Sequence, residues 1–148
     1  MKRILSALPL VFLAACTSPF GSSAPELQVR TDQEEYVAHP IGFISPVGFT
    51  VKNEGDASIY LPRCGDQVTV AVDRREGGEW RQAYSGICPA VNVSSPLELK
   101  PGESVRSVVS VGEPGRYRIR VRSADSPGSE RFDEAVSNPF TVEYSPMD

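Results

Sequence analysis

The sequence is poor in the groups that most catalytic and metal sites need. Its 148 residues include one histidine, His39, and three cysteines. No Cys-x-x-Cys pair occurs, so His39 lacks partners at the usual zinc-ligand spacing. Nucleophile-elbow, phosphate-loop, dinucleotide and zinc-protease motifs are also missing. We expect no metal, no cofactor and no enzymatic activity, although a pair of carboxylates that meet only in space would escape such patterns.

No apolar run is long enough to cross a bilayer as a helix. Residues Ile4 to Ala14 carry no charge, but they fall short of the about 20 residues a spanning helix needs, and Pro9 interrupts them. Following Lys2 and Arg3, this run has the layout of an export signal. The formal net charge of −4 also argues against nucleic acid as a partner.

The export signal ends in Leu13-Ala14-Ala15-Cys16, which resembles the lipobox of bacterial lipoproteins at every position. The resemblance implies cleavage before Cys16, a diacylglycerol on its thiol and an acyl chain such as palmitate on its new amino group. Two or more chains hold a protein firmly on a membrane. Thr17 is not the aspartate associated with inner-membrane retention, so in a Gram-negative cell the resemblance favours the outer membrane, facing the periplasm. The alternative is an ordinary secretory signal in which Cys16 is incidental.

This resemblance divides the chain into three parts. Residues 1–15 are the expected signal peptide, residues 16–25 the lipidated cysteine and a flexible tether, and residues 26–148 a folded domain. The tether, TSPFGSSAP, is small, polar and proline-containing, and it reaches at most ~30 Å. Cleavage removes two positive charges and lowers the formal net charge from −4 to −6.

If Cys16 carries lipid, Cys64 and Cys88 remain as one pair. In an oxidising compartment such a pair is expected to form a disulfide, worth roughly 3–4 kcal/mol for a loop of this size. The alternatives are two free thiols or a metal pair.

Strand signals dominate the rest of the sequence. Thirteen prolines and twelve glycines separate short segments, many of which alternate between apolar and polar residues. Gly77-Gly78 is typical of a two-residue hairpin turn. We predict an all-β fold of about seven or eight antiparallel strands in a single sandwich. The expected strands cover residues 27–30, 48–52, 59–61, 68–73, 97–99, 105–111, 116–122 and 140–144.

Four segments resemble the bacterial immunoglobulin-like domains: VKNEGDASIYL, LKPGES, GRYRIRV and SNPFTV. The resemblance covers Leu27 to Tyr144 and implies an immunoglobulin-like or fibronectin-like sandwich, with little information about function. The chain departs from antibody domains in one respect. Cys64 and Cys88 lie close together in sequence, on either side of the Gly77-Gly78 hairpin. A bridge between them would therefore link the two ends of the segment that contains this hairpin.

A row of arginines is the most unusual feature. In a strand from Arg116 to Arg122, the period of two places Tyr117, Ile119 and Val121 on one face and the arginines on the other. The simpler interpretation is a solvated face whose arginines pair with acids on neighbouring strands, Glu143 among them. The sharper interpretation is an anion or partner site, because guanidinium groups bind phosphate through paired contacts. This row consists of Arg116, Arg118, Arg120 and Arg122.

Two aromatic residues lie outside the main pattern. Phe132 stands among acids in the segment 124–138, which we interpret as a loop, and it either contacts a partner or holds the loop to the domain. Trp80 is expected to pack across the hairpin on Val70 or Val72.

Three functions remain open. The first is a non-enzymatic envelope module that binds a protein or glycan through loops or an edge strand. The second is a proteinase inhibitor, in which Ile87-Cys88-Pro89 would form the rigid blocking segment. The third is a spacer without a ligand.

Overall fold

The computed structural model describes residues 27–38, 44–86, 88–89, 92 and 94–144. The expected signal peptide, Cys16 and the tether lie outside these residues. Within them every regular element is a strand, and no helix has the length and hydropathy to span a bilayer. The strands are β1 (Leu27–Thr31), β2 (Glu35–Ala38), β3 (Ser45–Asn53), β4 (Ile59–Leu61), β5 (Arg63–Cys64), β6 (Gln67–Val68), β7 (Val70–Glu76), β8 (Glu79–Ser85), β9 (Leu97–Leu99), β10 (Ser104–Val111), β11 (Gly115–Ser123), β12 (Asp133–Val136) and β13 (Phe140–Tyr144).

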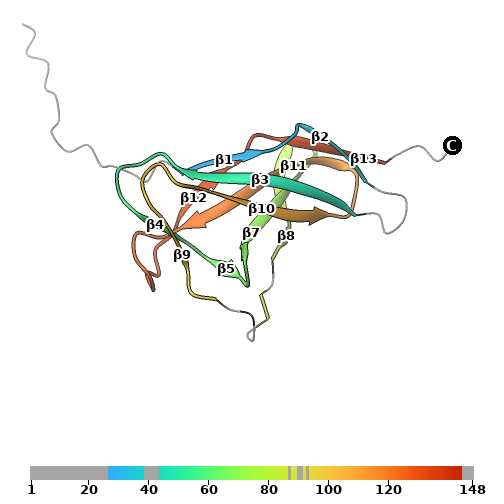
Figure 1. Ribbon diagram of the computed structural model, residues 1–148. Helices are drawn as coiled ribbons and strands as arrows, with labels where there is room; N and C mark the ends of the chain where they lie inside the picture. The colour runs from blue at the N-terminus through green and yellow to red at the C-terminus, as the bar shows by residue number, and fades with distance from the viewer. Residues whose placement is uncertain (1–26, 39–43, 87, 90–91, 93, 145–148) are drawn as a thin grey trace, which may run out of the picture.

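Two sheets face each other and form the sandwich that the sequence predicts (Figure 1). One has the order β1-β3-β10, and the other has the order β2-β13-β11-β7-β8, with β12 also paired to β11. Two small pairs, β4–β9 and β5–β6, lie at one end. The described residues hold more strands than expected, partly because Pro62 has no N–H and separates β4 from β5. The β2–β13 pair is parallel, whereas only antiparallel pairs were expected.

The core forms because the two central strands alternate. In β3 and β11 every second residue is buried, and these residues meet between the sheets. Burial of such side chains stabilises the fold by about 1.5–3 kcal/mol each. At one end three aromatic rings pack together. The ring centroid of Phe140 lies 5.5 Å from that of Tyr36, with the rings edge to face, and 5.8 Å from that of Tyr117, with the rings stacked.

Two local predictions are confirmed. Gly77 and Gly78 have φ angles of 58° and 90°, the positive values that a tight hairpin between β7 and β8 requires. Cys64 and Cys88 form the disulfide, with their Cα atoms 5.4 Å apart. The bridge links β5 to the chain that follows β8, at the two ends of the segment that contains the hairpin.

One expectation needs correction. The segment 124–138 is a loop only in its first part, because Asp133–Val136 forms β12 and pairs with β11. Ser137 continues this pairing: its N–H donates to the Ile119 carbonyl at 2.9 Å, and its hydroxyl accepts from the Ile119 N–H at 2.9 Å. The side chain thereby supplies the acceptor that the backbone ladder would otherwise lack between β12 and β13.

Candidate functional site

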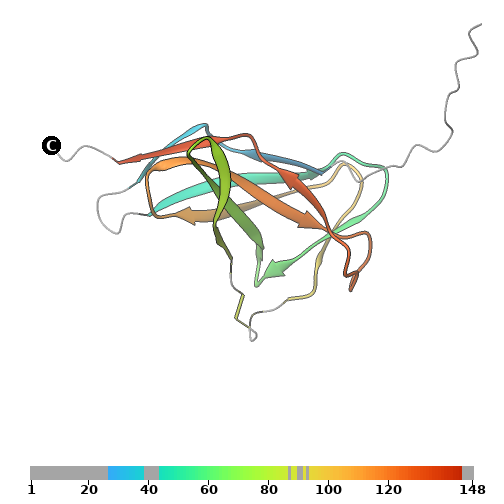
Figure 2. The same cartoon turned by 180° about the vertical axis from the view of Figure 1, so that it is seen from behind.

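The arginine row lies on the outer face of the larger sheet, which is nearer the viewer in Figure 2. Tyr117, Ile119 and Val121 point into the core at 2% exposure or less, so the predicted separation of faces is confirmed. The structure adds neighbours that the sequence did not place beside this row. They come from β7 and β12, which pair with β11, and from β8, the strand beyond β7.

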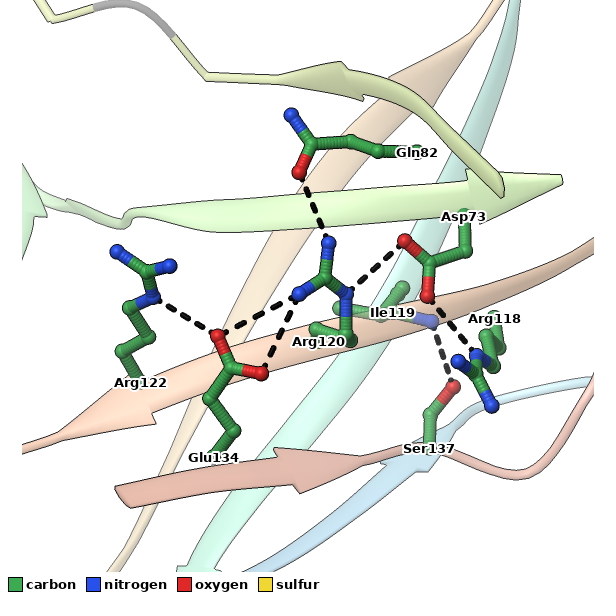
Figure 3. A network of polar contacts seen from close by, with 8 residues as sticks. All are labelled: Asp73, Gln82, Arg118, Ile119, Arg120, Arg122, Glu134 and Ser137. Atoms are coloured by element: carbon green, nitrogen blue, oxygen red, sulfur yellow. Dashed lines mark hydrogen bonds and ion pairs between the residues drawn. The ribbon is translucent and has the colours of Figure 1, made fainter. Parts of the chain in front are cut away.

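A layer of polar side chains covers this face, and Asp73 of β7 is at its centre (Figure 3). We call it the polar layer; it consists of Asp73, Gln82, Arg118, Arg120, Arg122 and Glu134. Its two carboxylate oxygens accept from different arginines: Oδ2 from Arg118 Nε and Oδ1 from Arg120 Nε, both at 2.9 Å. The residue is only 3% exposed although it points away from the core. The two guanidinium groups therefore replace the water that a buried carboxylate would lose.

Glu134 of β12 extends the layer to the other side of β11. Arg120 Nη1 lies 3.3 Å from Glu134 Oε2, and Arg122 Nε lies 2.9 Å from Glu134 Oε1. Arg120 also donates to Gln82 Oε1 at 2.9 Å. The hydrogen bond from Arg122, followed by those from Arg120, lowers the pKa of Glu134 below its ordinary value. Burial would lower the pKa of the Arg120 guanidinium, but hydrogen bonds and charges of Asp73 and Glu134 raise it above its ordinary value.

The expected packing of Trp80 is wrong. Trp80 lies opposite Arg75 on the outer face, and the Arg118 guanidinium lies 4.7 Å from its ring centroid. The tight turn fixes this placement, because it pairs Glu76 with Glu79 and hence Arg75 with Trp80. A cation over a tryptophan ring is stabilising by about 0.5–1 kcal/mol at exposed sites. Trp80 therefore packs against the polar layer.

The charges of this layer do not cancel. Asp73 and Glu134 supply two negative charges against three arginines, and Glu143 makes none of these contacts, contrary to expectation. Arg118 and Arg120 are largely covered, whereas the Arg122 side chain is 63% exposed and uses only Nε toward Glu134. Arg116 is exposed and takes no part in these ion pairs. The ion-pairing interpretation thus holds for the centre of the row, and Arg122 keeps donors for another group.

A cavity of about 350 Å³ adjoins Arg122. Its apolar part is formed by Pro62, Val70 and Ala71, and its polar part by the side chains of Gln82, Arg120, Arg122 and Glu134. Phe132, which is 45% exposed, stands at its edge and also lines a second cavity of about 170 Å³ beside Tyr60 and Ala124. The structure therefore brings together three residues singled out from the sequence: Arg120, Arg122 and Phe132.

Three partners of the arginines were not predicted from the sequence: Asp73, Gln82 and Glu134. The signal available was the register of the hairpin: counting back from Gly77-Gly78 places Asp73 opposite Gln82 on the outer face. Glu134 required knowledge that β12 exists. In the segment considered for protease inhibition, Cys88 is held in the disulfide and is half-buried, while Ile87 lies outside the described residues.

The fold and the site define a β-sandwich domain with an ion-paired outer face and a cavity edged by one exposed aromatic ring. The chain matches no protein-family model and none of the curated protein sequences. Among solved structures it is similar to one described as an ApaA protein of Bordetella pertussis, with 15% identity over 83% of this chain and 97% of that chain and a TM-score of 0.49.

Two other solved structures are more distant in shape. The CARDB domain of a Pyrococcus furiosus protein, solved with di-metal ions, shares 15% identity over 83% of this chain and 97% of its own, with a TM-score of 0.38. A β-glucosidase of Listeria innocua shares 17% identity over 80% of this chain but only 16% of its own, with a TM-score of 0.37. The fold class therefore follows from the strand pairings described above.

Proposed function

We propose that the protein is a lipid-anchored module of the bacterial cell envelope that binds a partner protein without catalysing a reaction. The anchor is Cys16, whose surroundings resemble the lipobox, in the outer membrane of a Gram-negative cell. A domain held by a tether of at most ~30 Å meets its partner close to the membrane.

The observation that carries the binding role is the cavity beside Phe132 and Arg122. A nearly half-exposed aromatic ring and a guanidinium that is mostly exposed line the same cavity, together with the apolar residues Pro62 and Ala71. Aromatic and arginine side chains are enriched among residues that dominate protein interfaces. The arrangement suits an apolar partner side chain next to a carboxylate.

The chemistry of the cavity supports a non-catalytic role. Glu134 is the acid of its lining, and Arg122 and Arg120 hold its pKa below the ordinary value. A general acid at neutral pH needs the opposite shift, toward the working pH. Glu134 serves instead to orient the two guanidinium groups.

The test places a photo-crosslinking amino acid at Phe132 of the full chain in its native membrane, with Val37 as a matched control position. Val37 is an exposed apolar residue of the same sheet, outside the cavity. We expect one protein adduct from position 132 and none from 37, and Arg122→Glu should lower the adduct yield by about tenfold, a loss of about 1.4 kcal/mol. Cys16→Ser should release the protein from the membrane.

Three outcomes contradict the proposal. Equal adducts from both positions would show that the cavity has no selectivity. An adduct to a glycan would assign a different partner class. A native amino terminus other than a lipidated Cys16, read by mass spectrometry, would remove the anchor.

A further inference from the structure

Strand β10 is an edge strand that is unusually long and regular for a β-sandwich. It ends the order β1-β3-β10 and runs through eight residues in unbroken register with β3. Three other edge strands of the two main sheets are shorter or irregular: β1 and β2 have five and four residues, and β8 carries a bulge. Natural proteins usually shorten, charge or bulge their edges because an open edge pairs with other chains. Arg106 is the single charged residue in β10.

The backbone groups that face outward from β10 can be identified. In an antiparallel pair, residues alternate between those that bond to the partner strand and those that point away. Gly48 lies opposite Val108, and its carbonyl accepts from the Asp32 N–H at 2.9 Å and from the Tyr36 hydroxyl at 3.2 Å, on the side away from β10. Val108 is therefore not bonded to β3, and its N–H and carbonyl point to the open edge.

Two further contacts agree with this assignment. Ser110 lies opposite Pro46, which has no N–H to offer β10. The Ser110 carbonyl instead accepts a hydrogen bond from the Tyr84 hydroxyl of β8, across the open edge. Burial raises the pKa of Tyr84 above its ordinary value, so this hydroxyl stays a donor. By the same alternation Arg106 also points its N–H and carbonyl outward, and no described residue bonds to those of Arg106 or Val108.

A groove of about 310 Å³ runs along this edge. Its lining includes Val108, Val109 and Ser110 of β10 and, from other segments, Val68, Tyr84 and Gly86. In both views β5 lies below β10 (Figures 1 and 2). Strand β6 contacts β10 and pairs with β5, so the edge of a second sandwich would meet this pair, whereas a single extended segment is narrower.

We propose that β10 accepts an extended segment of the partner protein as a fourth strand of the sheet β1-β3-β10. The inference rests on the proposed binding function and adds a second contact surface for the same partner, with its mode of recognition. The backbone groups of Arg106 and Val108 pair with the backbone of the segment, which an extended polypeptide offers and a glycan does not. The groove has an apolar part formed by Val68 and Val109, which suits an apolar side chain of the segment.

The first experiment places a photo-crosslinking amino acid in turn at Arg106, Val108 and Ser110 of the full chain in its native membrane. Added strands lie in register, so the three adducts should fall on one partner segment at steps of two residues. Arg30 is the control position, exposed on β1 at the opposite edge of the same sheet. Adducts to a second copy of this chain, to a glycan, or scattered over several segments would each overturn the proposal.

The second experiment compares Val108→Pro with Val108→Ala, read by the adduct yield from position 106. Proline removes the outward N–H and adds a ring at the edge without breaking a bond to β3, so we expect a loss of about tenfold or more. Alanine keeps the N–H and should change the yield by about twofold at most. Equal effects of the two variants would overturn strand addition. If Val108→Pro does not fold, the spacing of the three adducts decides alone.

The two proposals can fail separately. Adducts from Phe132 with none from β10 would reject strand addition and leave the binding function standing. Adducts from neither surface would reject both.

Discussion

The carboxylate of Asp73 is buried on the side of the sheet that faces solvent, because Arg118 and Arg120 bind both of its oxygens. Removal of one member of a buried ion pair leaves the remaining charges without compensation, which costs more than the pair itself contributes. The neutral amide in Asp73→Asn would face two cations.

We predict that Asp73→Asn lowers the free energy of unfolding by about 2–4 kcal/mol, below the loss for a fully buried pair because both arginines retain some exposure. Urea denaturation at neutral pH measures this change. Glu143→Gln on β13 of the same sheet is the control, with an expected change within about 0.5 kcal/mol. An equal loss in the two variants would contradict the role assigned to Asp73.

Glu134 should make stability depend on pH in the acid range. Its pKa is lower in the folded protein than its ordinary value of 4.5, so the carboxylate favours folding above that value. This contribution is lost as the pH falls through the folded-state pKa. We predict that Glu134→Gln is less stable than the parent at neutral pH by at most about 1 kcal/mol, because the side chain is 36% exposed and screened.

The difference between Glu134→Gln and the parent should shrink toward zero on acidification below 4.5, measured by unfolding across a pH series. Glu98→Gln, at an exposed position of β9, serves as the control with no such trend. A gap that widens toward acid would have the wrong sign.

At the scale of elements, the disulfide stabilises the β5–β6 region, which belongs to neither of the two main sheets. Cys64 belongs to the two-residue strand β5, and its neighbour Gly65 donates its N–H to the Asn92 carbonyl at 3.0 Å. The bridge closes a loop with a sequence separation of 24 residues. Much of its effect falls on the unfolded chain, whose freedom it restricts.

We predict that replacing Cys64 and Cys88 together by serine lowers the free energy of unfolding by about 2–4 kcal/mol. Amide exchange should quicken most at Gly65 and β6, because the local hairpin loses its covalent support. The centre of β3 is the internal control and should change only with global stability. A uniform rise in exchange would show that the bridge supports the core directly.

The elements also show what the sequence could predict. Alternation is visible in the sequence of β11, and the glycine pair marks the turn before β8, so both were predicted. The bulge opposite Val72 and Asp73 was not, since one extra residue leaves no mark in the composition. That shift turns Tyr84 inward while Trp80 faces outward, although both are aromatic and four residues apart.

For the whole molecule, the sandwich follows from patterns in the sequence, whereas the site follows from contacts between strands far apart in the chain. The order of residues shows four arginines at alternate positions, and it shows Phe132 among acids. The sequence alone goes no further. It cannot show that Asp73 lies buried between two of the arginines, or that Pro62 and Phe132 share two cavities. Such contacts depend on strand order, which a single sequence does not encode locally.

The pairing of β2 with β13 has a consequence for biosynthesis. Near this pair, the Thr31 N–H donates to Asn138 Oδ1, 107 residues further along the chain. A nascent chain emerges with its amino-terminal end first, so β2 leaves the ribosome long before its neighbour has been translated. The sheet closes only after synthesis has passed Tyr144, and the incomplete polypeptide must be kept from premature association until then.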